Sequence, residues 1–189
     1  MGFRALQPLA ARWQADGGTG LVHLNLRPNG ERILADGLAI GDRDGTRYGV
    51  HFRITCGMDW KTQSLDLEAT DGRGVHVVAD EEARWSDRDG NRLPVFDGCV
   101  DIDLEGTPFT NTLPIRRLDL APETGAVDLR MLYVPFDDFQ PFVDEQRYRC
   151  VRPGHYRYEA VDGSFDADIT VDEDGLVVDY PPLFRRLPL

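Results

Sequence analysis

Three carboxylates stand two positions apart at Asp101, Asp103 and Glu105, with apolar residues between them. On a β-strand, residues at this spacing point to one face, with Cβ atoms roughly 6.5–7 Å apart. Carboxyl groups separated by about 5–9.5 Å catalyse glycoside hydrolysis, and carboxylate oxygens also bind hard cations. We favour a strand face that points to water, because charged residues are mostly exposed. A pairing of this face with Arg116 and Arg117 on a neighbouring strand would hold the register of the sheet.

The segment 107–114 that follows is the best candidate for a binding site. Its side chains include Thr110 and Asn111, which are neutral donors and acceptors of the kind that bind sugar hydroxyls. Arg116 or Arg117, next along the chain, could hold a phosphate or carboxylate through two parallel hydrogen bonds. An ordered crossover loop, whose polar side chains bond their own backbone, is an equally good interpretation.

Aromatic residues are numerous in the C-terminal half, and Tyr148, Tyr156 and Tyr158 are the candidates for contact with a ligand. Tyrosine has an apolar ring with a polar tip, which suits a sugar or the mouth of a lipid pocket. Tyr156 and Tyr158 share one strand face, however, and this favours packing in the core. Three phenylalanines within residues 136–142 lie near prolines and could form a mobile lid instead of core.

The sequence indicates no other familiar chemistry. The three cysteines, Cys56, Cys99 and Cys150, are widely spaced without a C-x-x-C pair, which indicates free thiols in a reducing cytosol. The four histidines form no H-x-H or H-E-x-x-H pattern, and no serine stands in a G-x-S-x-G motif. We therefore predict no catalytic residue, no metal site and no cofactor.

The chain of 189 residues carries a formal net charge of -12, with a pI of about 4.7. Such a charge repels nucleic acid and anionic membrane surfaces, so we expect neither as a partner. The sequence contains neither a convincing signal peptide nor a run of about 18 apolar residues. We therefore expect a cytoplasmic protein without a transmembrane segment. The oligomeric state is not indicated.

Asp-Gly and Asn-Gly pairs recur along the chain and mark tight turns between short runs of alternating apolar and polar residues. We expect one β domain over residues 1–189, in which residues 1–15 can be loosely ordered. The fold class is all-β, a single large curled antiparallel sheet that forms a barrel or half-barrel with little helix. Short helical turns fit residues 8–14 and 136–143. The predicted strands are 21–27, 33–40, 46–56, 60–69, 74–80, 83–86, 99–104, 112–118, 127–134, 145–151, 155–161, 164–171 and 176–180.

Two segments are long and unusual: D-G-C-V-D-I-D-L-E-G-T-P-F-T-N-T-L-P-I-R-R-L at 97–118 and Y-R-Y-E-A-V-D-G-S-F-D-A-D-I-T-V-D-E-D-G-L-V-V-D-Y-P at 156–181. With L-F-R-R-L at 183–187, they resemble the bacterial family described as putative glycolipid-binding proteins. The resemblance extends from about residue 13 to residue 187. It implies an all-β, barrel-like fold, likened to bacterial lipoprotein carriers that hold acyl chains in a β half-barrel. It implies no catalytic residue.

We favour a lipid- or glycolipid-binding protein that holds an acyl chain in a groove of the curled sheet, with polar contacts to the head group. The candidate ligand-binding residues are Asp101, Asp103, Thr110, Asn111, Arg116, Arg117, Tyr148, Tyr156 and Tyr158. One alternative is a hydrolase that acts on a glycolipid or sugar ester through Asp101 or Asp103, with Arg116 or Arg117. Another is a non-catalytic protein-interaction module that uses a sheet edge or an aromatic strip.

Overall fold

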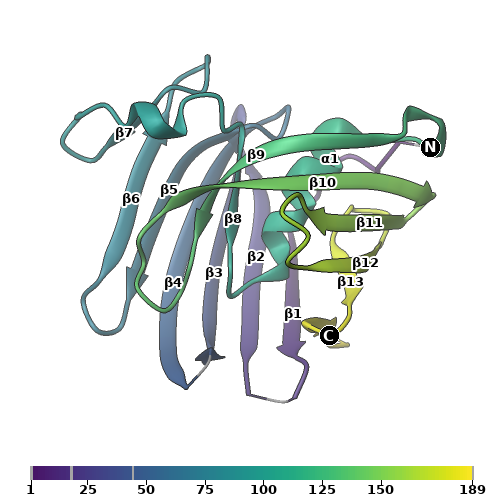
Figure 1. Cartoon of the computed structure of the whole chain (residues 1–189), viewed down its shortest axis with the longest axis horizontal. Helices are drawn as coiled ribbons and strands as arrows, with labels where there is room; N and C mark the ends of the chain where they lie inside the picture. The colour runs from purple at the N-terminus through teal and green to yellow at the C-terminus, as the bar shows by residue number, and fades with distance from the viewer. Residues whose placement is uncertain (1, 18, 44, 189) are drawn as a thin grey trace.

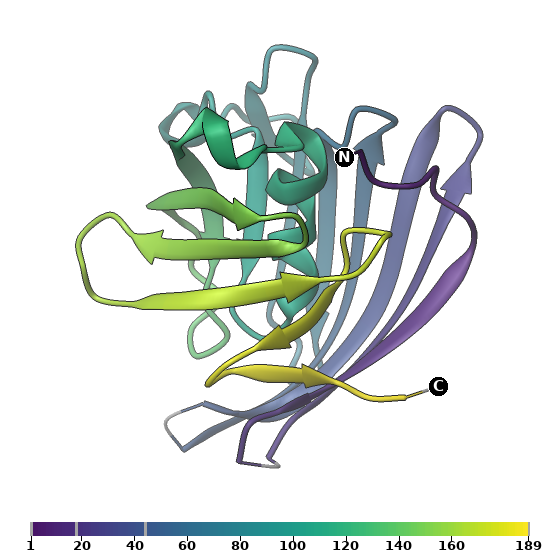
Figure 2. The same ribbon diagram turned by 90° about the vertical axis from the view of Figure 1, so that its right-hand side faces the viewer.

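The computed structural model describes residues 2–17, 19–43 and 45–188 of the chain. Strands make up 54% of the structure and helices 9%. Within the described residues, fourteen strands form one mixed sheet that curls without closing (Figure 1, Figure 2). The expected all-β fold with little helix is confirmed in its half-barrel form, whereas the sheet does not complete a barrel.

The elements have the following bounds. The strands in chain order are β1 (Leu9–Ala15), β2 (Leu21–Asn29), β3 (Arg32–Arg43), β4 (Thr46–Gly57), β5 (Thr62–Ala69), β6 (Gly74–Ala79), β7 (Trp85–Asp87), β8 (Asp101–Leu104), β9 (Ala126–Val134), β10 (Phe142–Arg152), β11 (His155–Ala160), β12 (Asp166–Val171), β13 (Val177–Tyr180) and β14 (Phe184–Arg186). The helical segments are α1 (Thr112–Leu118) and the short 3-10 turns η1 (Pro94–Phe96), η2 (Pro108–Asn111) and η3 (Pro122–Thr124).

The order across the sheet is β7-β6-β5-β4-β3-β2-β1-β14-β13-β12-β11-β10-β9-β8. Among the described residues every strand pairing is antiparallel except that of β8 with β9, which is parallel. A parallel pair needs a crossover of a dozen or more residues, usually with a helix. Residues 105–125 supply this crossover, and it contains η2, α1 and η3. The sheet is therefore mixed and not purely antiparallel as expected.

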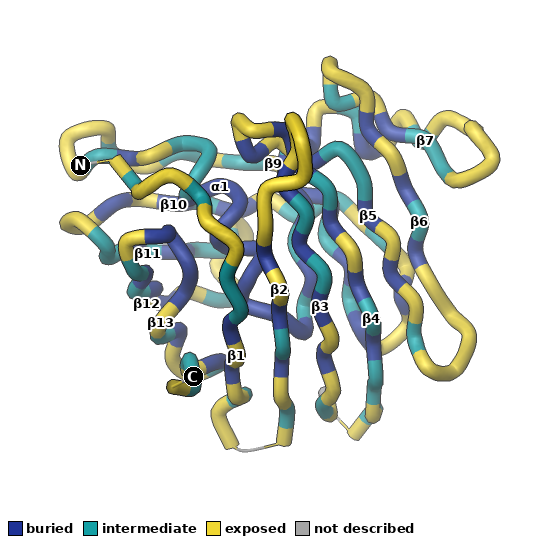
Figure 3. The backbone as a smooth tube through the Cα atoms, turned by 180° about the vertical axis from the view of Figure 1, so that it is seen from behind, coloured by how far each residue is buried: buried dark blue, intermediate teal, exposed yellow. Residues whose placement is uncertain are grey.

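The curled sheet has two halves, one formed by β1 to β7 and the other by β8 to β14. The halves face each other, with α1 between them (Figure 1, Figure 2). Buried and exposed residues alternate along the long strands, so each strand has one face in the core (Figure 3). Gly37 of β3 stands in an inward row, where the ring of its cross-strand partner Phe52 covers it. A Cβ atom at Gly37 would lie 2.3 Å from Cζ of Phe52, so the close approach of this ring requires glycine.

The predicted strand at 112–118 is wrong, because this segment forms the helix α1. The Thr107 side chain accepts a hydrogen bond of 3.2 Å from the backbone N–H of Phe109 and so begins the helical segment. Pro108 begins η2, and Pro114 lies in the first turn of α1, where a missing N–H does no harm. The alternation of apolar residues along this short segment resembles a strand, whereas its proline positions are those of helix starts.

Two expected helical regions are also different in the structure. Residues 9–15 form the strand β1, which pairs with β2 and with the C-terminal strand β14, so the helical turn predicted at 8–14 is wrong. The segment before β10 is a turn, in which Phe136 and Phe139 are buried in the core while Phe142 is exposed. This burial contradicts a lid built from the three rings. The loose ordering of residues 1–15 and the single-domain organisation stay predictions.

Candidate functional site

A cavity of about 710 Å3 opens at one end of the half-barrel. In an antiparallel meander every second turn lies at the same end of the sheet, because each hairpin reverses the chain. The turns that follow β1, β3, β9, β11 and β13 meet at this end, and they or the adjoining strand ends line the cavity. The site is thus assembled from segments that are far apart in the sequence.

Two kinds of side chain dominate the cavity wall. The carboxylates are Asp16, Asp42, Asp103, Glu105, Asp144 and Asp162. The aromatic rings are Tyr48, Tyr133, Phe142, Tyr158, Phe165, Tyr180 and Phe184. Among the described lining residues there is no lysine, arginine or histidine. Flat rings beside hydrogen-bond acceptors suit a ligand that has apolar faces and donor groups, as a sugar does.

The deepest polar wall of the cavity is a network around Asp103 of β8. The hydroxyl of Thr110 donates a hydrogen bond of 2.7 Å to Oδ1 of Asp103. The Nε2 amide of Gln146 donates to Oδ2 of Asp103 at 2.8 Å and to Oδ2 of Asp144 at 2.9 Å. Behind them, the hydroxyl of Tyr148 donates to Oδ1 of Asn111 at 2.9 Å. These bonds fix the orientation of the groups that face the cavity.

The carboxyl groups of this network hold protons more tightly than usual. Burial is the largest cause of the raised pKa of Asp103, and the negative charges of Asp144 and Glu105 raise it further. Burial also raises the pKa of Asp144, with a contribution from the charge of Asp162. The hydrogen bonds that both groups accept from Gln146 act in the opposite direction but do not cancel these effects. The cavity therefore concentrates negative charge that repels itself.

Asp101 lies on the same strand but does not line the cavity. Its side chain is 1% exposed, and Nε of Arg117 donates to both of its oxygens at 3.1 Å. Burial raises the pKa of Asp101, while the guanidinium of Arg117 lowers it. The favoured interpretation of this strand face as solvated is wrong, because the crossover packs α1 on it. Arg117 contacts Asp101 from a helix and not from a neighbouring strand as predicted.

Arg116 is also engaged away from the cavity. Its guanidinium carbon lies 5.2 Å from the ring centre of Phe3 and 4.6 Å from that of Trp60. Its Nη1 donates to the carbonyl oxygen of Arg4 at 2.9 Å and to that of Asp174 at 3.2 Å. These contacts tie the N-terminal segment to α1 and place both predicted arginines outside the cavity wall.

Of the nine predicted ligand-binding residues, Asp103, Asn111 and Tyr158 line the cavity. Thr110 and Tyr148 are buried directly behind these three, to which the network connects them. Tyr156 is buried near Cys150, further along the sheet. The structure therefore brings together one third of the predicted set, and a binding role for all nine residues stays a prediction.

Several lining residues were missed by sequence reasoning. Asp16 and Asp162 precede glycines and were interpreted only as turn residues, while Asp42 lies near the end of the long strand β3. Asp144 lies in β10, a strand that was predicted to begin only at residue 145. Counting the hairpins along the sequence could have grouped these residues. Turns that are separated by two strands lie at the same end of an antiparallel sheet.

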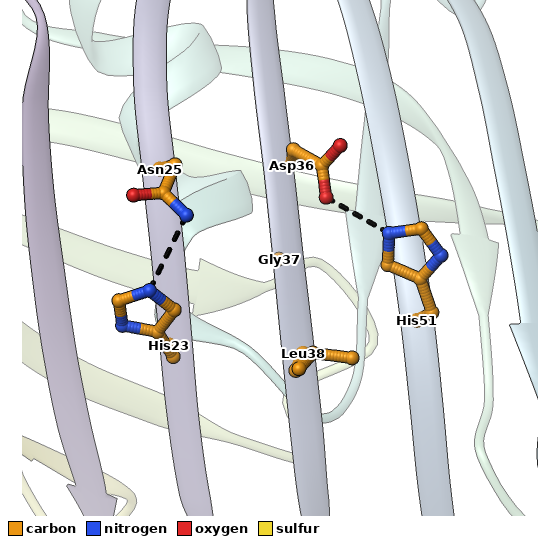
Figure 4. A pocket seen from close by; sticks show the side chains of 6 residues that line it. All are labelled: His23, Asn25, Asp36, Gly37, Leu38 and His51. Carbon is orange, nitrogen blue, oxygen red and sulfur yellow. Dashed lines mark hydrogen bonds and ion pairs between the residues drawn. The ribbon is translucent and has the colours of Figure 1, made fainter.

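A second, smaller hollow of about 320 Å3 lies on the outer face of β2, β3 and β4 (Figure 4). His51 Nε2 lies 2.8 Å from Oδ1 of Asp36, and His23 Nε2 lies 3.3 Å from the side-chain nitrogen of Asn25 (Figure 4). Leu38 projects between these pairs and is 53% exposed. The polar groups of this hollow already bond one another, and it has no aromatic wall. We therefore regard the cavity at the open end as the candidate site.

In the part of the chain that the structure describes, no group of three or more histidine, cysteine, aspartate and glutamate residues is arranged to hold a metal ion. Within the same residues, none of the helices has the length and apolar character needed to cross a membrane.

Comparisons with known proteins agree with the fold and with the sequence motifs. A solved crystal structure of a DUF1089 family protein from Pseudomonas aeruginosa superimposes on this chain with a TM-score of 0.76 and 39% sequence identity. The match covers 89% of this chain and 92% of that one. No match was found among curated proteins. A family model described as "Putative glycolipid-binding" matches residues 10–186. The chain therefore belongs to the putative glycolipid-binding family.

Proposed function

We propose that the protein binds a glycolipid in the cavity at the open end, with the sugar head group inside and the acyl chain at the rim. Family membership supports a glycolipid-binding role in general. The volume of about 710 Å3 lies within the range of roughly 300–1,000 Å3 that is typical of small-molecule sites.

One observation carries the proposal: Asp103, Asn111, Asp144 and Tyr158 come from four different elements and line the same aromatic cavity. The carboxylate oxygens can accept hydrogen bonds from sugar hydroxyls, and the aromatic rings offer apolar faces to the ring carbons. The buried network behind these groups, with Gln146 at its centre, favours a preformed site.

The acyl chain is assigned to the rim of the cavity. Phe142 is 48% exposed there, and Phe165 and Leu183 are half-buried nearby in the cavity wall. The space deeper between the two halves of the sheet is occupied by buried side chains of the crossover, such as Phe109 and Leu113. We therefore expect an apolar tail to find its partners at the mouth of the cavity, while the predicted groove along the interior stays a prediction.

Calorimetric titration with octyl β-glucoside, below its micelle-forming concentration, tests the proposal. The Ala160→Trp variant places a large ring in the cavity wall and is expected to weaken binding at least tenfold. The matched control is Val151→Trp, at an exposed position near the opposite end of the sheet, and it should bind as the unmodified protein does. Failure of the unmodified protein to bind, or equal binding by both variants, would contradict the proposal.

A further inference from the structure

We propose that the head group preferred by this cavity is a sugar that carries a protonated amino group, and that head groups with a negative charge are excluded. The inference rests on the proposed function, because it concerns the ligand of the same cavity. It adds the charge class of the ligand, which neither the family description nor the fold specifies.

The first support is the composition of the cavity wall. Its six acidic residues come from separate parts of the sheet: two belong to the first four strands, two to β8 and its end, and two to the β10–β12 region. No basic side chain stands among the described lining residues. Arg116 and Arg117, the groups suited to a phosphate or carboxylate, are bound to Asp174, Arg4 and Asp101 instead. An anionic head group would therefore meet like charges without a compensating cation.

The second support is the low exposure of the deepest carboxyl groups. Asp103 and Asp144 are partly buried side by side and share the amide of Gln146 as their donor. Burial is the largest cause of both raised pKa values, and the negative charge of Asp144 raises that of Asp103 further. An ammonium group in the cavity beside them would offset this negative charge and form hydrogen bonds that are stronger than those of a hydroxyl. A neutral sugar would gain the hydrogen bonds but not the charge attraction.

The third support distinguishes an amino sugar from a simple cation. The carboxylates of the described residues do not form a cluster arranged for a metal ion. Tyr158 and Tyr180 present rings in the same wall, and an aromatic face attracts both a cation and the apolar face of a sugar. The volume of about 710 Å3 is far larger than an ammonium ion alone requires. The combination fits a sugar ring with an amino substituent better than an isolated cation.

The test compares three amphiphiles that share one tail: octyl glucosaminide, octyl glucoside and octyl glucuronide. Their dissociation constants are measured by calorimetry at pH 7 and at low and high salt. We expect the amino sugar to bind about tenfold more tightly than the neutral sugar, and the uronate to bind at least tenfold more weakly than the neutral sugar. High salt should narrow both differences, because it screens charges near the cavity mouth.

A pair of double variants separates the cavity charge from the net charge of the molecule. Asp16→Asn with Asp162→Asn removes two carboxylates from the mouth, and should reduce the preference for the amino sugar several-fold. Glu31→Gln with Glu81→Gln removes the same charge from exposed positions outside the cavity, and should leave the preference unchanged.

The outcomes distinguish this inference from the function on which it rests. If all three amphiphiles bind equally, or if the uronate binds best, the charge preference is refuted while glycolipid binding stands. Equal effects of the two double variants would also refute it, because the preference would then come from the net charge. If none of the three binds, the proposed function itself fails, and the charge preference fails with it.

Discussion

At the scale of the residue, Asp101 and Arg117 form an ion pair that is almost entirely buried. Asp101 is 1% exposed, so the Arg117→Ala variant would leave a buried carboxylate without its partner. We expect a loss of about 3–5 kcal/mol in the free energy of unfolding, measured by urea denaturation at pH 7. Arg185→Ala removes one partner of an exposed pair with Asp179 and should cause a far smaller loss. Equal losses in the two variants would contradict this account.

Asp103 gives a prediction about pH. A raised pKa means that the native state holds a proton that the unfolded chain has already released, so this group destabilises the native state as pH rises above about 4. The Asp103→Asn variant cannot ionise. Its stability relative to the unmodified protein should therefore improve as the pH rises from about 4 towards the pKa of Asp103 in the native state, which urea denaturation at successive pH values can measure.

The control for this prediction is Asp128, whose hydrogen bond and ion pair with Arg147 lower its pKa. A lowered pKa contributes stability that appears as pH rises through the ordinary range of aspartate. The Asp128→Asn variant should therefore become less stable relative to the unmodified protein between pH 3 and pH 5. If the relative stability of both variants changed with pH in the same direction, the environment of Asp103 would not be the cause of the pH dependence of Asp103→Asn.

Residue types alone predicted part of the candidate site. Asp103 was singled out by the spacing of its carboxylate from Asp101 and Glu105, and Asn111 because a neutral amide suits sugar hydroxyls, and both line the cavity. Asp16 and Asp162 could not be selected in this way, because an aspartate before a glycine is explained fully by its turn. Their position at the cavity depends on which end of the sheet each turn occupies, and this is a property of the whole meander.

At the scale of the element, the crossover that contains α1 decides the shape of the site. It makes β8 parallel to β9, fills the space between the halves of the sheet and presents Thr107 and Asn111 to the cavity. Alternation of apolar residues predicted a strand here, because a seven-residue helix is too short to show its own period clearly. The helix is stabilised by its tertiary contacts, which the local sequence does not display.

Leu113 tests the role of these contacts. Its side chain is fully buried between the halves of the sheet, so Leu113→Ala should cost about 2–5 kcal/mol in the free energy of unfolding. Leu118, at the partly exposed end of the same helix, provides a matched change, and Leu118→Ala should cost clearly less. If thermal or urea denaturation gave the opposite order, α1 would not be packed as described.

At the scale of the whole molecule, the sequence predicted a curled all-β sheet from its turns and its alternating runs, and this was correct. It did not predict that the first strand, β1, pairs with the last strand, β14. That pairing joins the two halves of the sheet and has no local signal, because the partners are at opposite ends of the chain. The fold class could therefore be predicted from the sequence, whereas the pairing that brings the two halves of the sheet together around the cavity could not.

Arg73 bridges the two halves of the sheet near the open end. Its Nη1 donates to the carbonyl oxygen of Asp137 at 2.6 Å, and its guanidinium carbon lies 4.7 Å from the ring centre of Phe139. The Arg73→Ala variant should speed amide hydrogen exchange several-fold in residues 136–141 without lowering overall stability much. Arg84→Ala removes an exposed arginine whose partners Asp80 and Glu82 are local, and should leave this segment unchanged. Unchanged exchange in both variants would show that the bridge is not formed in solution.

The central claim is that a glycolipid head group occupies the cavity at the open end of the half-barrel. A crystal structure of the protein with octyl β-glucoside tests it most directly. We expect the sugar to lie among the rings of the cavity, with its hydroxyl groups within hydrogen-bond distance of Asp103, Asn111 or Tyr158. A sugar bound in the outer hollow around Leu38 would contradict this claim. So would a cavity that holds only water at a saturating concentration of octyl β-glucoside.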